Sequence, residues 1–183
     1  MNIIDFENIN VGYDSKIILK DITLKIKEKE HWAILGANGS GKSTLMKLIQ
    51  SEIHPRKTNP YKKEILGKSN YSIFELKKEL GIITNDLHNY FAMNGSFLTG
   101  YIAVLSGHYS SIGVFKHQDF SESQHEKAKE TMKYLEIEHL ANKYVQEMST
   151  GELRKCIVAR ALIHDPKAFV LDEPTVGLDI KAQ

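Results

Sequence analysis

A nine-residue stretch near the N-terminus, residues 36–44 (GANGSGKST), constrains this chain more than any other part of its sequence. It fits the pattern G-x-x-x-x-G-K-[ST], in which glycines let the backbone curl so that several N–H groups face one anion. The apolar run at residues 32–35 predicts a strand before it. Helical spacing after it predicts a helix with Leu45, Leu48 and Ile49 on its inner face. A strand, a glycine-rich loop and a helix in this order predict a site for the phosphates of a nucleoside triphosphate.

The residue types in this loop match the chemistry of a phosphate site. The ammonium of Lys42 is a mobile charge for the outer phosphates, and the hydroxyl of Ser43 can reach a Mg²⁺ ion. The first turn of the following helix adds partial positive charge at the same place. The residues expected to hold the nucleotide are Gly36, Asn38, Gly39, Ser40, Gly41, Lys42, Ser43 and Thr44.

Composition places the chain among ordinary globular proteins. Its 183 residues suit one domain, with 42% hydrophobic and 26% charged residues. A net charge of +1 gives no strong field toward nucleic acid or anionic lipid, so direct nucleic-acid binding is disfavoured. The lone Cys156 excludes a disulfide framework, and its apolar surroundings predict a small buried side chain. No apolar run is long enough to span a bilayer and no signal peptide is recognisable, so we expect a cytoplasmic protein.

The N-terminal half reads mainly as strands. Alternating apolar and polar residues predict short strands within residues 1–35, with turns at residues 14–15 and 28–30. The lysine-rich residues 51–71 are interpreted as a surface excursion. A short helix is expected over residues 74–80, followed by a buried strand at residues 81–83.

The C-terminal half begins with a loosely patterned stretch and then becomes helical. A capping-box pattern at residues 123–126 predicts the start of one helix, and a second is expected over residues 151–164. The apolar run at residues 168–171 predicts a buried strand that ends in Asp172 and Glu173. Ligands of open α/β sheets bind at such carboxyl ends, although two adjacent acids could also form ordinary salt bridges.

These segments occur in a familiar order: Tyr13, the glycine-rich loop, residues 148–152 (MSTGE), residues 169–173 (FVLDE) and Asp179. This order resembles the ATP-binding cassette (ABC) ATPases over essentially the whole chain. The resemblance implies an α/β fold: a P-loop NTPase core with a RecA-like sheet and N-terminal antiparallel strands, plus an inserted α-helical subdomain.

The resemblance also implies how the chain is divided. We expect a single ABC ATPase domain over residues 1–183, with its core at about 1–84 and 144–183 and the helical subdomain at about 85–143. A weaker similarity links the stretch from Ser106 to Gly113 and the MSTGE segment to the molybdate-transport or photorepair type of cytosolic cassette.

The family assigns a role to individual residues here. Tyr13 corresponds to the aromatic residue that stacks on adenine, although a strand-edge tyrosine is the simpler interpretation. Lys42 serves catalysis by holding the outer phosphates. Asp172 corresponds to the carboxylate that holds Mg²⁺ together with Ser43, and Glu173 to the base that polarises the attacking water.

Ser149 and Gly151 correspond to a signature that acts across a dimer. Two cassettes stack head to tail in the family, so that each signature closes on the γ-phosphate held by the other chain. Asp179 corresponds to an aspartate at the same interface. Ser149 with Glu152 also fits an ordinary helix capping box, and both interpretations can hold together.

Two features depart from the family pattern. Asn85 stands where the family has a glutamine; its shorter amide is still expected to reach Mg²⁺ or the attacking water. The sequence ends at Gln183, before the segment in which the family has a γ-phosphate-contacting histidine. This makes weak hydrolysis an alternative, and the chain is expected to be either truncated or a fragment.

The expected function is therefore that of a cassette that binds Mg-ATP and hydrolyses it as a head-to-tail pair, in a homodimer or with another cassette. We expect it to drive a membrane-spanning transporter subunit, which would hold it at the inner face of the membrane. The alternatives are an ATP-binding module with little hydrolysis and a soluble cassette of the repair or translation type.

Overall fold

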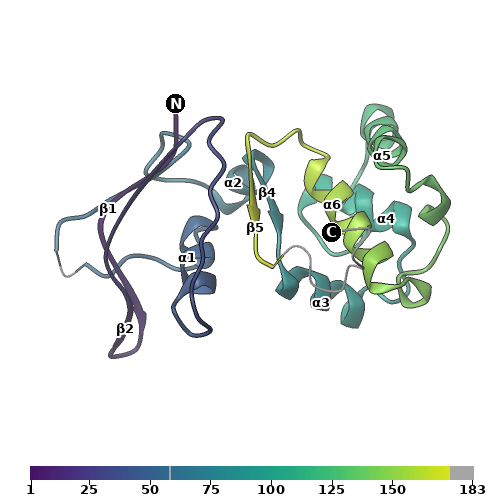
Figure 1. Ribbon diagram of the computed structural model, residues 1–183. Coiled ribbons are helices and arrows are strands. Elements are labelled where there is room, and N and C mark those ends of the chain that lie inside the picture. The colour runs from purple at the N-terminus through teal and green to yellow at the C-terminus, as the bar shows by residue number, and fades with distance from the viewer. Residues whose placement is uncertain (58, 174–183) are drawn as a thin grey trace. The chain divides into compact units, whose positions relative to one another are not determined.

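The computed structural model describes residues 1–57 and 59–173. It forms two compact units, Met1–Leu76 and Lys77–Gln183, each described below by itself (Figure 1). Helix α2 (Ile73–Glu79) spans the boundary between them and matches the helix expected over residues 74–80. Within the described ranges, no helix combines the length and the apolar character needed to cross a membrane. The predicted split into a core and an inserted helical subdomain stays a prediction.

A three-stranded antiparallel sheet forms the frame of the first unit. Strands β1 (Asn2–Tyr13) and β2 (Lys16–Lys27) form a long hairpin around the turn predicted at residues 14–15, and each is longer than the short strands that the sequence predicted. Strand β3 (Lys62–Ile65) pairs with the other edge of β1, which gives the order β2-β1-β3. The interpretation of residues 51–71 as a surface excursion is therefore wrong for this strand. Its two lysines concealed it, but one of them, Lys62, pairs with the buried Asp5 of β1.

Helix α1 (Lys42–Ile49) completes the core of this unit (Figure 1). Its buried side chains are those that the helical spacing predicted, namely Leu45, Leu48 and Ile49. Fully buried side chains of the sheet include Phe6, Ile9 and Ile65. Burial of such side chains is the main favourable term in folding, at about 25 cal/mol per Å² of apolar surface.

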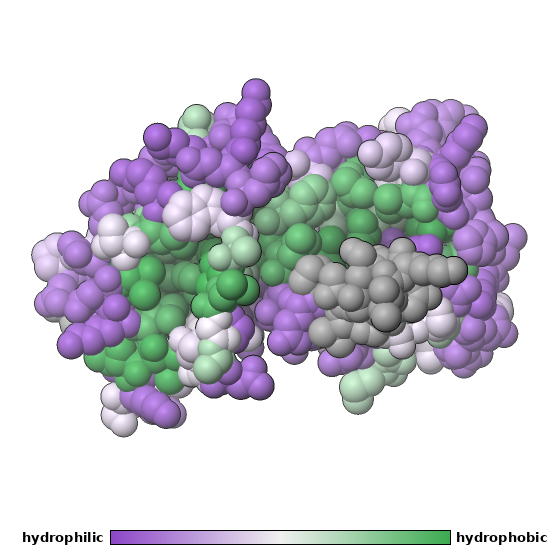
Figure 2. Space-filling model, in the orientation of Figure 1, coloured by the Kyte–Doolittle hydropathy of each residue, from purple (hydrophilic) through white to green (hydrophobic). Residues whose placement is uncertain are grey.

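The strand predicted at residues 32–35 does not form. Residues 30–37 are neither helical nor extended in a sheet, and Leu35 is 91% exposed. An apolar run becomes a strand only where a neighbouring strand satisfies its backbone groups, and no strand pairing includes these residues. Figure 2 shows hydrophobic surface on the visible face of this unit, framed by hydrophilic side chains.

A two-stranded parallel sheet lies in the second unit. Strands β4 (Leu80–Ile83) and β5 (Ala168–Leu171) pair in register from Leu80 opposite Ala168 to Ile83 opposite Leu171. Both strands were predicted, but β5 is not fully buried, because its Phe169 and Leu171 are about half exposed. A Cβ on Gly81 would meet the Phe169 ring of the neighbouring strand, so a larger residue here would force that ring to move.

Helices fill the chain between β4 and β5. The three short helical turns among them are η1 (Ser106–Tyr109), η2 (Glu138–Leu140) and η3 (Val145–Glu147). The longer helices are α3 (Asn85–Asn94), α4 (Gly100–Leu105), α5 (Glu122–Tyr134) and α6 (Thr150–Leu162). Helices α4, α5 and α6 pack together around one apolar cluster (Figure 1).

Two details of this helical region bear on the sequence predictions. Helix α5 starts two residues earlier than expected: its N-cap is Ser121 with Gln124, because a glutamine side chain closes a capping box as well as the predicted Glu126. Cys156 is fully buried beside Met148, and burial raises the pKa of its thiol to about 12. The prediction of a small buried side chain at this position is confirmed.

Candidate active site

The glycine-rich loop takes the left-handed turns that its sequence predicted. Gly39 has φ = 81° and Gly41 has φ = 95°, a region that side chains disfavour. Gly41 is also the N-cap of α1, and a Cβ there would lie 2.7 Å from Cδ2 of Leu19. Both backbone conformation and packing therefore require glycine at position 41, directly before the lysine of the motif.

Helix α1 begins without a side-chain cap, unlike its counterparts in the second unit. Thr84, Thr99, Ser121 and Ser149 each accept a backbone N–H at the start of their helices, whereas the Gly41 cap of α1 offers no side chain. The first-turn N–H groups of an α-helix have no partner within the helix. The start of α1 thus keeps donors and partial positive charge for an external anion, which fits a nucleotide phosphate.

The side chain of Lys42 bends back over the loop. Its Nζ donates hydrogen bonds to the carbonyl oxygens of Gly36, at 2.7 Å, and Ala37, at 3.0 Å. An ammonium group has three donors, so this pose holds the charge over the loop while one N–H remains for an incoming oxygen. Lys42, Ser43 and Thr44 occupy the first turn of α1, where the sequence expected them.

Tyr13 lies at the end of β1, where the hairpin turns, and is 48% exposed. The turn is anchored by Arg56, whose Nη2 donates to the carbonyl oxygens of Asp14 and Lys16. The backbone N–H of Arg56 also donates to Asn10 O at 2.7 Å. Sequence reasoning did not single out Arg56, because nothing local links it to a turn about 40 residues earlier.

The two predicted acids follow β5 directly. The Asp172 N–H donates to Ile83 O at 3.0 Å, which extends the parallel pairing by one hydrogen bond. Glu173 has φ = 48°, an uncommon conformation for a residue with a side chain. The chain thus turns sharply at the carboxyl end of the strand, at the place where the sequence predicted a ligand site.

A hydrogen-bonded relay reaches the carboxylate of Glu173 from helix α6. Asn85 Nδ2 donates to Glu173 Oε2 at 2.9 Å, and Arg154 Nη2 donates to Asn85 Oδ1 at 2.5 Å. Arg154 is only 2% exposed, and burial lowers the pKa of its guanidinium. A buried cation of this kind is retained where it is hydrogen-bonded. The relay fixes which way the Asn85 amide faces and presents its N–H to the predicted base.

Asn85 was predicted as a metal ligand, and Arg154 was not singled out at all. In this structure the acceptor oxygen of Asn85, the atom that Mg²⁺ would need, already accepts from Arg154. Its role at a metal stays a prediction. Sequence order could not reveal Arg154, because 69 residues separate it from Asn85.

The signature segment opens α6 with a complete capping box. Ser149 Oγ accepts from the Glu152 N–H at 3.2 Å, and Glu152 Oε2 accepts from the Ser149 N–H at 2.7 Å. Lys143 also donates to Glu152, so the pKa of this carboxyl falls to about 2, with the Lys143 hydrogen bond as its largest cause. The predicted cap is confirmed, while the action of Ser149 and Gly151 across a dimer stays a prediction.

No group of three or more His, Cys, Asp and Glu side chains that could hold a metal ion occurs in the part of the chain that the structure describes. The Mg²⁺ site predicted at Ser43 and Asp172 stays a prediction. Asp179 lies outside the described residues.

The glycine-rich loop and the uncapped helix that follows it are the features of a P-loop nucleotide-binding protein. A family model described as ABC transporter matches residues 19–176. The chain therefore belongs to the ATP-binding proteins of ABC transporters, a family of ATPases. The predicted fold class, an α/β P-loop NTPase fold with antiparallel N-terminal strands, is confirmed.

Several curated proteins are similar to this chain. An uncharacterized ABC transporter ATP-binding protein of Methanocaldococcus jannaschii is 34% identical over 181 residues, which cover 99% of this chain and 67% of that protein. A second from the same organism is 33% identical, covering 96% of this chain and 58% of that protein. The ABC transporter ATP-binding protein ModF of Escherichia coli is 31% identical, covering 92% of this chain and 34% of its own length, which agrees with the weaker subgroup similarity.

Solved structures show the same fold. A nucleotide-free ATP-binding cassette from an ABC transporter matches with a TM-score of 0.80 at 23% identity, covering 100% of this chain and 73% of that one. A dimeric cassette in a post-hydrolysis state, bound to ADP and Pi, matches with a TM-score of 0.70 at 25% identity, covering 98% of this chain and 77% of that one.

Proposed function

We propose that this chain binds Mg-ATP at the glycine-rich loop and hydrolyses it as one member of a head-to-tail pair of cassettes. The observation that carries the proposal is the start of α1, where uncapped N–H groups and the Lys42 ammonium converge on one loop. These groups suit the β- and γ-phosphates of a nucleotide. Tyr13, on the hairpin turn that Arg56 anchors, would stack on the adenine ring.

The reacting groups come from the carboxyl end of β5. Glu173 would accept a proton from the attacking water, with its carboxylate oriented by the Asn85 amide. Bound Mg²⁺ would supply charge neutralisation at the phosphate oxygens, held by Ser43 and Asp172. Ser149 and Gly151 of a second cassette would face the γ-phosphate. A dimeric cassette among the similar structures supports the paired arrangement.

We propose that ATP hydrolysis by this chain drives a membrane-spanning partner subunit. The support is that similar proteins carry the name ABC transporter ATP-binding protein. The helical stretch between β4 and α6 is the proposed docking region. If the protein instead stays out of the membrane fraction in cells that also produce the candidate partner, the soluble type of cassette is favoured.

The test combines binding of a fluorescent ATP analogue with phosphate release, for the parent chain and for Glu173→Gln. We expect both proteins to bind the analogue with similar affinity. Phosphate release should fall about 100-fold or more in the variant, because general-base catalysis contributes 10²–10⁴-fold. Lys42→Ala should weaken binding and abolish release.

Each other outcome has a definite meaning. If Glu173→Gln releases phosphate at the parent rate, Glu173 is not the base. Tight binding by the parent chain without any phosphate release would overturn hydrolysis and favour an ATP-binding module. Failure of the parent chain to bind the analogue at millimolar concentration would overturn the nucleotide site itself.

A further inference from the structure

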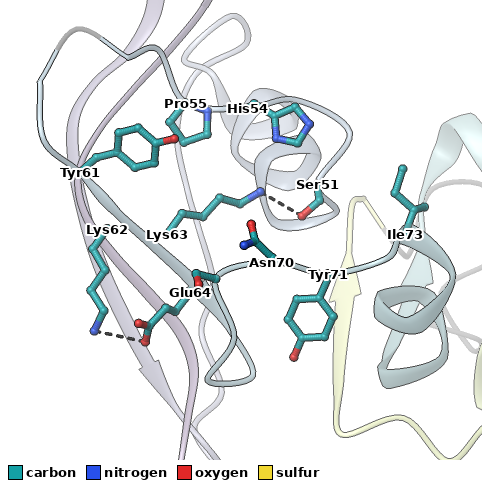
Figure 3. A pocket seen from close by; sticks show the side chains of 11 residues that line it. Ser51, His54, Pro55, Tyr61, Lys62, Lys63, Glu64, Asn70, Tyr71 and Ile73 are labelled. Carbon is teal, nitrogen blue, oxygen red and sulfur yellow. Dashed lines mark hydrogen bonds and ion pairs between the residues drawn. The ribbon is translucent and has the colours of Figure 1, made fainter.

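The first unit contains a hollow that the nucleotide site does not use. Its volume is about 590 Å³, within the range of small-molecule pockets. Its walls come from the segment that follows α1, from β3 and from the segment that leads into α2 (Figure 3). None of the residues lining it belongs to the phosphate loop or to the hairpin turn that carries Tyr13.

Lys63 of β3 is the distinctive group in this hollow. Its Nζ donates to Ser51 Oγ at 2.9 Å (Figure 3). Among the described residues, no carboxylate forms an ion pair with this ammonium. Burial lowers the pKa of Lys63 to about 8, and no neighbouring charge offsets that cost. The ammonium is therefore partly desolvated and lacks a counter-anion.

The neighbouring Lys62 differs from Lys63 in that the protein already pairs its charge. Its Nζ lies 2.8 Å from Asp5 Oδ2 and 3.3 Å from Glu64 Oε2, so its charge is already neutralised by the protein. Hydrogen bonds to the same two carboxylates raise its pKa. Of these two adjacent lysines, only Lys63 has a charge that an external anion would newly neutralise.

The other side chains that line the hollow indicate which further chemical groups a bound anion would have. Ser51 and Asn70 provide neutral hydrogen-bonding groups near Lys63, and Tyr61 and Tyr71 provide aromatic rings (Figure 3). We propose that this hollow binds a small organic anion with a flat ring, whose carboxylate or phosphate group pairs with the ammonium of Lys63. The rings would contact the flat body, and the amide and hydroxyl would bind the remaining oxygens.

The primary test is a titration of the full chain with benzoate, followed through the lysine ¹³Cε NMR signals. Benzamide, which has nearly the same shape without the charge, and acetate, which lacks the ring, are the matched ligands. Phenyl phosphate separates a phosphate preference from a carboxylate preference. We expect a saturable shift at Lys63 with benzoate or phenyl phosphate, at least tenfold weaker with benzamide and with acetate. Equal responses to benzoate and benzamide, or no shift at Lys63, would overturn the proposal.

Substitutions at Lys63 distinguish the effect of removing its charge from an effect on folding. Lys63→Met keeps the length of the side chain and removes its charge, so benzoate affinity should fall at least tenfold. Lys63→Arg should keep it, and Lys20→Met, on the exposed side of β2, should change nothing. Binding of the fluorescent ATP analogue, unchanged in all three, verifies that they are folded. If Lys63→Met binds benzoate as the parent does, the proposal is wrong.

The pH dependence gives an independent check. The affinity of the parent chain should be nearly full at pH 7 and about tenfold lower at pH 9, as the Lys63 ammonium loses its proton around pH 8. The other titratable groups of the hollow are His54, Tyr61, Lys62, Glu64 and Tyr71. Lys63→Arg stays charged over this range, so its affinity should be flat. A parallel fall in Lys63→Arg would assign the dependence to those other groups and overturn the role of Lys63.

Discussion

The phosphate loop (residues 36–44) and the acidic corner after β5 (Asp172 and Glu173) differ in how far apart in the sequence their interacting residues lie. In the loop, the hydrogen bonds of Lys42 stay within nine consecutive residues, because it donates to carbonyl oxygens five and six positions before it. In the corner, Glu173 depends on Asn85, 88 residues away, and through it on Arg154. The first site is a property of local sequence, whereas the second exists only when β4, β5 and α6 have packed together.

This difference predicts where mutations outside the motifs matter. A local site should be less sensitive to changes elsewhere in the fold, as long as its own glycines and the packing of Leu19 against Gly41 remain. An assembled site is sensitive to any residue in its chain of hydrogen bonds, including a buried one that never meets the substrate. The predictions below probe that contrast, starting with the largest expected effect.

ATP turnover should fall when the hydrogen bonds from Arg154 through Asn85 to Glu173 are removed. Arg154→Met is expected to lower kcat about 10- to 100-fold while the affinity for ATP changes little, because Glu173 keeps its chemistry but loses its orientation. Asn85→Ala should have a similar effect. The double variant should be no worse than the worse single one, since both substitutions cut the same relay.

The control for this prediction is Lys155→Met, the next residue on α6, which is exposed. Steady-state phosphate release with varied ATP separates kcat from KM for the parent chain and the four variants. If the two single effects multiply in the double variant, Arg154 and Asn85 act independently and the relay does not orient the base.

The hairpin turn should show an intermediate effect on binding. Arg56→Gln frees the turn that carries Tyr13, so the affinity for ATP is expected to fall about tenfold, as it should in Tyr13→Ala. Affinity for inorganic triphosphate, which has no base to stack, should be unchanged. Competition against a fluorescent ATP analogue measures both ligands, with the exposed neighbour Lys57→Gln as control. An equal loss for triphosphate would show that Arg56 supports the phosphate loop instead.

The smallest effect is expected at the start of α6, where the chain already satisfies its own backbone. Ser149→Ala should lower the free energy of unfolding by about 1 kcal/mol, the usual cost of losing a side-chain cap. Thr150→Ala, one residue further, should stay within about 0.5 kcal/mol. Urea denaturation at pH 7 measures both, and equal losses would contradict the cap.

The stability that the capping box of Ser149 and Glu152 contributes should depend on pH. The folded-state pKa of Glu152 is lowered to about 2, so its ionised form stabilises the fold above its ordinary value of 4.5. That contribution is lost as the pH falls from 4.5 toward 2. The stability difference between the parent chain and Glu152→Gln should therefore shrink across this window. A difference that stays constant would mean that the Lys143 and Ser149 contacts do not depend on the charge.

Local signals made much of this protein predictable. The loop before α1, the capping box of α6 and the strands β4 and β5 each follow from neighbouring residues, and each is present. Strand β3 was missed because its lysines look like surface, and its stability depends on Asp5 of another strand. The run at residues 32–35 was overpredicted, because apolar character alone does not provide a pairing partner.

The supporting residues of the site could not be foreseen for the same reason. Arg56 and Arg154 act on turns and side chains that only the fold brings near them. An arginine on a helix carries a weak signal, since long side chains often reach the surface from such positions. The motif residues are therefore readable from the sequence, and the residues that hold them in place are not.

The burial of Cys156 has a practical consequence for studying this protein. The chain has one cysteine, and a fully enclosed thiol with a pKa of about 12 supplies almost no thiolate for maleimide or iodoacetamide chemistry at neutral pH. A cysteine introduced at the exposed Ser15 would consequently be labelled with almost no background. A fluorophore or spin label at that turn could report on nucleotide arrival in the otherwise unmodified parent sequence.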